Sequence, residues 1–132
     1  MNIRVVSSKE EIETLSPNEE MIHLAFRPAN TDLFTIVQKC PQVKAFHIPT
    51  SYKRTISTSA RMFLQMQNIE LLEGDVWGHR KDINEYSGIS QGVYDRIKQY
   101  RENGMPEQDI TEKLVRETRL SPDLITFLMQ NS

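Results

Sequence analysis

The fold class is decided by residues 43–72, VKAFHIPTSYKRTISTSARMFLQMQNIELL. Val43–Ile48 and Ile69–Leu72 are short runs rich in β-branched and aliphatic residues, which predicts two strands. Between them, Thr55–Gln67 carries apolar residues at near-helical spacing, which predicts a helix. A strand, a helix and a second strand in succession predict a parallel pair of strands joined by a right-handed crossover.

The same unit recurs on the N-terminal side of this stretch. Ile3–Val6 and Met21–Phe26 have the composition of strands, and Glu10–Leu15 and Asp32–Lys39 are helical in pattern, with Thr31 as the expected cap of the second helix. We therefore predict an α/β fold with a small four-stranded, mainly parallel sheet and crossover helices.

The pattern changes after residue 77. From Gly78 onward the strand signal disappears and the sequence becomes helical in pattern, with a helix stop at Asn103-Gly104 and a new start at Pro106. We expect two lobes, an α/β lobe over residues 1–77 and a helical lobe over residues 78–132.

Residues 82–104, DINEYSGISQGVYDRIKQYRENG, predict two short helices joined by a tight turn. Gly88 is expected at the turn, at a positive φ that would be costly for a residue with a Cβ. Ser90 is expected to cap the second helix with its hydroxyl. The apolar positions that such a pair of helices buries are Ile83, Ile89, Tyr94 and Ile97.

A weaker copy of this pattern follows at LVRETRLSPDLITFLMQ, where Ser121 and Leu128 correspond to Ser90 and Ile97. Pro122 suits the first helical position after a Ser121 cap. The outward set expected for this last helix is Pro122, Asp123, Thr126 and Phe127, with Met129 nearby. An aspartate and apolar groups do not suit a phosphate backbone, so we expect a packing or homodimer surface there.

The stretch DINEYSGISQGVYDRI resembles the helix-turn-helix of bacterial and archaeal transcription regulators, although Asn84, Ser87 and Gly92 depart from the usual pattern. In such proteins the second helix of the motif enters the major groove of DNA. Glutamine and arginine can address base edges, and lysine can hold a phosphate. The resemblance predicts a DNA-binding transcriptional regulator whose contacts are made by Ser90, Gln91, Asp95, Arg96, Lys98 and Arg101.

The whole chain, notably LLEGDVWGHRKDINEY and HLAFRP, is also similar to an uncharacterised family of small proteins from methanogenic archaea. That resemblance implies a cytoplasmic archaeal protein with a regulatory role and no established biochemistry.

The charge of the chain argues against DNA as the partner. Sixteen lysines and arginines against 18 aspartates and glutamates give a net charge of −2, whereas DNA-binding domains usually present a basic footprint. No acidic residue lies between Asp32 and Glu70, but residues 102–123 lean acidic. A weak or dimer-dependent DNA binder remains compatible with this distribution, and so does a protein-interaction module that binds no nucleic acid.

A second candidate site follows the strand at Val43–Ile48. Hydroxyls and cations gather there at an expected helix start, where free N–H groups favour an anion. The residues of this weaker anion-binding site are Ser51, Lys53, Arg54 and Thr55. They define a third alternative, an α/β protein that binds a phosphate ligand.

No pattern indicates an enzyme, a cofactor or a metal site. Glu73, Asp75 and His79 lie near Trp77 but fit no closed metal site, and Trp77 is expected to seal the junction of the two lobes. His23 and His47 fall inside predicted strands, where histidines are usually structural. Cys40 is the only cysteine, which excludes an intrachain disulfide.

No apolar run is long enough to span a bilayer, and the start MNIRVVSSKEE lacks the apolar core of a signal peptide. We therefore expect a cytoplasmic protein without a membrane partner.

Overall fold

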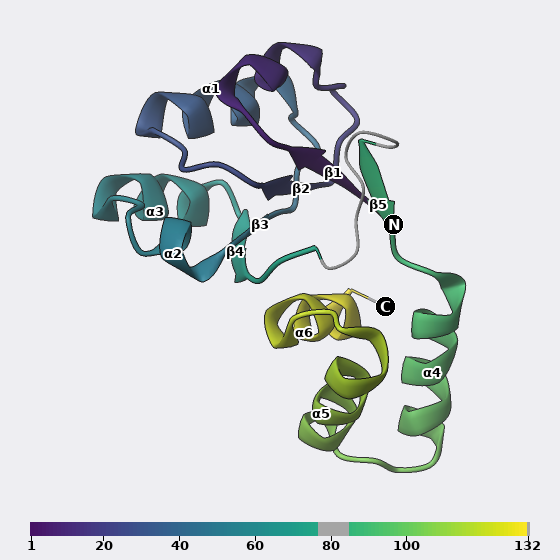
Figure 1. The fold of residues 1–132 in the computed structure, drawn as a ribbon. Coiled ribbons are helices and arrows are strands. Elements are labelled where there is room, and N and C mark those ends of the chain that lie inside the picture. Colours follow the sequence, from purple (N-terminus) through teal and green to yellow (C-terminus); the bar gives the residue numbers. More distant parts are fainter. Residues whose placement is uncertain (77–84, 132) are drawn as a thin grey trace.

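In the computed structural model, which describes residues 1–76 and 85–131, a five-stranded sheet lies between two layers of helices (Figure 1). The strands are β1 (Asn2–Val6), β2 (Met21–Leu24), β3 (Ala45–Ile48), β4 (Glu70–Glu73) and β5 (Tyr86–Gly88). The helices of the N-terminal part are the 3-10 helix η1 (Lys9–Thr14), α1 (Asn30–Lys39), α2 (Thr50–Lys53) and α3 (Thr58–Met66). The C-terminal helices are α4 (Gln91–Glu102), α5 (Glu107–Thr118) and α6 (Pro122–Gln130).

The four predicted strands are confirmed, and each pairs in parallel with the next along the chain. The strand order is β4-β3-β2-β1-β5, so the connections through η1, α1 and α3 all step in the same direction. Right-handed crossovers that step in one direction place their helices on one face of the sheet. The other face must then be covered by another part of the chain.

The fifth strand was missed, and it replaces the first helix of the pair expected at residues 82–104. Tyr86–Gly88 pairs antiparallel with β1, and the N–H of Ile89 donates to the carbonyl of Met1 at 3.0 Å. Gly88 is not among the residues with positive φ, so it is a strand end and not a helix stop. The edge of β1 needed a hydrogen-bonding partner, and this requirement outweighed the local helical pattern.

Two helix predictions need smaller corrections. The helix expected over Thr55–Gln67 is α3, which begins three residues later, because Ser57 caps it by accepting from the N–H of Ala60. The short helix α2 precedes the expected range. Thr31 lies inside α1, whose N-cap residue is Ala29, and the carboxylate of Asp32 accepts from the backbone N–H of Ala29 at 2.8 Å.

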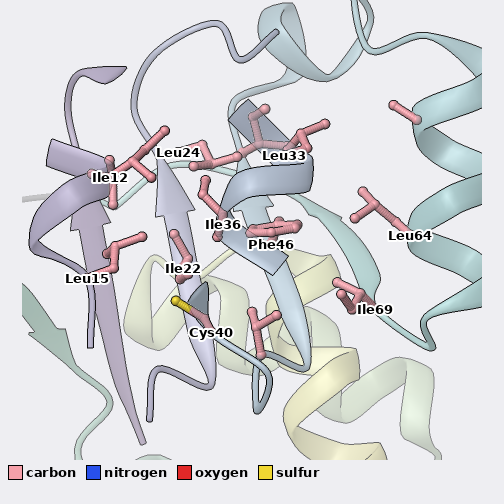
Figure 2. Packing of buried hydrophobic residues seen from close by; sticks show 14 of the residues in the cluster. Ile12, Leu15, Ile22, Leu24, Leu33, Ile36, Cys40, Phe46, Leu64 and Ile69 are labelled. Carbon is pink, nitrogen blue, oxygen red and sulfur yellow. The ribbon is translucent and has the colours of Figure 1, made fainter. Parts of the chain in front are cut away.

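The first core lies between the sheet and the crossover helices, as Figure 2 shows. Ile22, Leu24 and Phe46 point from the strands toward Leu33 and Ile36 of α1 and toward Leu64 of α3. Cys40 is fully buried at the end of α1, where burial raises the pKa of its thiol to about 11. This core fixes the helices of the N-terminal part on one face.

The second core lies on the opposite face and joins the two parts of the chain. Ile3, Met21, Ala45 and Leu72 alternate along their strands with the residues of the first core, and they pack against α4, α5 and α6. The C-terminal helices are therefore the second helical layer of the sheet. Their packing on the sheet decides which face of each of these helices is exposed to solvent.

Candidate nucleic-acid interface

The helix predicted to read DNA is α4, and its inner and outer faces follow its sequence. Val93 and Ile97 are buried against the second core, one helical turn apart. Ser90 is the N-cap residue as predicted, but its hydroxyl makes no capping hydrogen bond. Asn103 ends the helix, and Gly104 follows at φ +78°, which confirms the predicted stop.

The outer face of α4 is exposed and polar, as the sequence predicted. The exposed residues on it are Ser90, Gln91, Gly92, Asp95, Arg96, Lys98, Gln99, Arg101 and Glu102. This set includes all six residues that were predicted to contact DNA. Gln91 and Asp95 are joined by a hydrogen bond of 3.2 Å along the helix.

Two of the three cations of α4 are bound by carboxylates of α5. Arg96 forms an ion pair with Glu117 at 3.2 Å, and Tyr100 donates to the same carboxylate at 3.1 Å. Arg101 pairs with Glu107 at 3.0 Å and donates to the carbonyl of Met129 at 2.8 Å. A phosphate approaching α4 would compete with these carboxylates, which lowers the net attraction of this face for DNA.

Of the two expected helix pairs, the weaker second copy forms as two helices joined by a tight turn, α5 and α6. Arg119 ends α5 in the left-handed region at φ 62°, a position where glycine is usual. The hydroxyl of Ser121 accepts from the N–H of Leu124, and Pro122 opens α6, as the sequence predicted. A turn of three residues, Arg119–Ser121, therefore joins the two helices.

The outward set predicted for α6 is wrong at its apolar members. Phe127 and Met129 are each 3% exposed, because α6 packs against β4 on one side and against α5 on another. Of the predicted set, Pro122 and Thr126 are exposed and Asp123 is half-buried. The apolar side chains that were expected to form a homodimer surface are thus covered within the monomer.

The four residues of the weaker anion-binding site lie together on and after the short helix α2. Lys53 is 3.8 Å from a carboxylate oxygen of Glu73, and the hydroxyl of Thr55 donates to the carbonyl of Tyr52. Ser51 and Arg54 are exposed. Anion binding at this cluster stays a prediction.

Sequence reasoning missed a buried polar chain at the C-terminal ends of β2 and β3. His23 and His47 are neighbours across the two strands, with their Nδ1 atoms 2.8 Å apart. The other ring nitrogen of His47 lies 3.2 Å from the hydroxyl of Ser121, and His23 Nε2 lies 4.0 Å from Asp75. Two histidines at the same position of adjacent strands were the available signal.

Two sets of tautomers satisfy these contacts, because either Nδ1 can donate to the other, and the position of Asp75 favours one set. A carboxylate beside His23 Nε2 favours a proton on that nitrogen, which leaves His23 Nδ1 as an acceptor. His47 then donates from Nδ1 and accepts the hydroxyl proton of Ser121 at Nε2. Burial, followed by the neighbouring His23, lowers the pKa of His47 to about 4, so the ring is neutral at pH 7.

The residue that follows β4, Gly74, covers the contact between His47 and Ser121. Gly74 has φ +153°, and a Cβ placed there would lie 2.4 Å from the Cβ of Ser121 and 2.6 Å from His47 Nε2. Only a glycine permits that approach. The linked side chains of His23, His47 and Ser121 therefore hold the start of α6 against the sheet. Trp77 and His79, which were considered beside Asp75, lie outside the described residues.

The fold and this interface define a class of protein, an α/β domain whose sheet is covered on one face by a C-terminal helix-turn-helix unit. The chain belongs to the DUF1699 family. Residues 2–85 match the model described as a family of unknown function (DUF1699) N-terminal domain, and residues 92–130 match the one described as a protein of unknown function (DUF1699) C-terminal HTH domain. Searches of curated proteins and of solved structures gave no match.

Within the parts of the chain that the structure describes, no helix has the length and apolar character needed to cross a membrane.

Proposed function

We propose that the protein is a DNA-binding transcription regulator that contacts DNA through the outer face of α4. The observation that carries the proposal is that this polar face is exposed within the helix-turn-helix region. The second helix of the motif, α6, offers much less, because five of its nine residues are buried. Lys98 and Gln99 are exposed on this face and would supply a phosphate-binding cation and a base-reading amide.

The ion pairs of α4 set the expected strength of binding. Because Glu117 holds Arg96 and Glu107 holds Arg101, few cations are free for phosphates, and we expect weak binding with a shallow dependence on salt. Removal of the Glu117 charge should free Arg96 for a phosphate. The Glu117→Gln variant is therefore expected to bind DNA more tightly than the wild type.

The test is fluorescence anisotropy with fragments of the organism's own genomic DNA at low salt. Lys98→Ala should weaken binding and reduce the slope of log affinity against log salt by about 1, as expected for one lost phosphate contact. Lys9→Ala, which removes an equal charge from η1, is the matched control. Glu112→Gln is the control for Glu117→Gln, since it makes the same charge change on α5 away from Arg96.

Equal effects of the paired variants would show that only net charge matters, and the assignment to α4 would be wrong.

The competing function is a protein-interaction module, and the acidic surface of α5 favours it. Glu107, Asp109, Glu112 and Glu117 outnumber the basic residues of that helix. If neither the wild type nor Glu117→Gln binds DNA at low salt, this second function replaces the first.

A further inference from the structure

The outer edge of the sheet at β4 lies at the bottom of a groove. The groove has a volume of about 530 Å³ and is walled by α3 on one side and by α6 on the other. Its walls include Arg61, Leu64 and Gln65 of α3 and Thr126, Phe127 and Gln130 of α6. The strand between these walls has the sequence ELLE.

The main chain of β4 shows what kind of group fits the groove. The N–H groups of Glu70 and Gly74 donate to carbonyls on the β3 side, at 3.0 and 2.9 Å. Alternation along a strand then directs the N–H and C=O of Leu71 away from β3, into the groove. Among the described residues no strand pairs with this edge, and an edge of this kind is a template for another strand.

The groove is closed at one end by α6. The carboxylate of Asp123 accepts the outward N–H of Glu73 at 2.8 Å, which ends the free part of the edge. The unpaired stretch is therefore short and centred on Leu71. Two copies of one such stretch can pair antiparallel about a two-fold axis, each Leu71 exchanging two hydrogen bonds with its counterpart.

The charges of the groove are also self-complementary. Arg61 is held by the carbonyls of Lys53 and Ile56, and no carboxylate of the described residues lies within ion-pair distance of it. Pairing about Leu71 places Glu73 of the second copy opposite Ile69, on the face of the sheet that α3 covers. Glu73, which lies 3.8 Å from Lys53 of its own chain, thus approaches a groove whose Arg61 has no carboxylate partner among the described residues.

We propose that a second copy of the chain occupies this groove, with β4 paired antiparallel to β4 about Leu71. The two sheets then form one continuous sheet, and the interface is isologous. This dimer is held by the main chain of β4, although Asp123, Thr126 and Phe127 of the set expected on the outer face of α6 also line the groove. It does not depend on DNA binding, so its tests are made without DNA.

The first test is a symmetric disulfide. In an antiparallel hydrogen-bonded pair the Cα atoms are about 5.5 Å apart, which lies within the range that a disulfide spans. Leu71→Cys is expected to form a covalent dimer under mild oxidation. Glu73→Cys is the matched control, because the two cysteines would be roughly 14 Å apart along the paired strands and would not bridge. The wild type, in which Cys40 is buried, measures the background level of cross-linking.

The second test is sedimentation velocity over a wide range of concentrations. The wild type is expected to dimerise. Leu71→Pro should weaken the dimer more than Leu71→Ala, because proline removes the outward N–H and leaves the ladder to β3 intact. Circular dichroism checks that each variant is folded.

Three results would overturn the proposal. They are a wild type that stays monomeric at the highest concentration, equal cross-linking of the two cysteine variants, and equal effects of proline and alanine at position 71.

Discussion

At the scale of single residues, His47 is the group whose chemistry is most altered by the fold. It is fully buried, bonded to His23 and near the hydroxyl of Ser121, and its pKa is lowered to about 4 chiefly by burial. The unfolded chain titrates near the ordinary value of 6.5. Between these two values the unfolded state binds more protons than the folded state, so the stability of the protein must fall as the pH falls.

We expect the loss that is due to His47 to begin near pH 6.5 and to be complete near pH 4. Its size should be about 3 kcal/mol, on the basis of 1.4 kcal/mol for each pKa unit. Urea unfolding across this pH range measures it. His47→Asn should show a shallower slope, since asparagine keeps a polar atom near His23 but does not titrate. A variant with the unchanged wild-type slope would contradict the assignment.

At the scale of elements, α4 contains the residue that fits it least well by propensity. Gly92 lies in the first turn of the helix, and a Cβ there would meet only the hydroxyl of Ser90 at 3.7 Å, an ordinary contact. Because glycine costs a helix conformational entropy, the fold alone gives no reason for glycine at this position.

Gly92→Ala is therefore expected to raise the free energy of unfolding by up to about 1 kcal/mol, as measured by urea titration. Gly74→Ala is the opposing control, since a Cβ at residue 74 collides with Ser121 and His47 and should destabilise the fold. A destabilising effect at residue 92 would show that the start of α4 is strained in a way that the helix geometry does not reveal.

Local pattern predicted the elements well where packing agreed with it. Val43–Ile48 and Asp32–Lys39 were found because buried strands and helices carry their own periodicity. Pattern failed at Tyr86–Gly88, where pairing with a distant strand decides the structure, and at Phe127, which is buried by contacts on a second side of its helix. The His23–His47–Ser121 chain depends on residues far apart in sequence, so no local signal predicts it.

At the scale of the whole molecule, the two cores make each part of the chain dependent on the other. The crossover helices cover one face of the sheet, and among the described residues it is the C-terminal helices that cover Ile3, Met21, Ala45 and Leu72 on the other. The N-terminal part without them would expose a continuous apolar face, which favours aggregation.

A chain that ends at residue 88 is accordingly expected to aggregate or to lack cooperative unfolding, although all five strands are present. Size-exclusion chromatography and thermal unfolding followed by circular dichroism measure this against the full chain. A monomeric fragment with a sharp unfolding transition would mean that the second core contributes little to the stability of the sheet.

The order of the strands and of the helices that cover them has a consequence for synthesis on the ribosome. Domains usually begin to fold from the N-terminus as the chain emerges. Here β1 pairs with β5, and β4 packs against α6, and both of these partners are made after the four parallel strands. One face of the nascent sheet thus stays uncovered until α4, α5 and α6 have been made, and in that interval the growing protein is a natural client for chaperones that shield apolar surface.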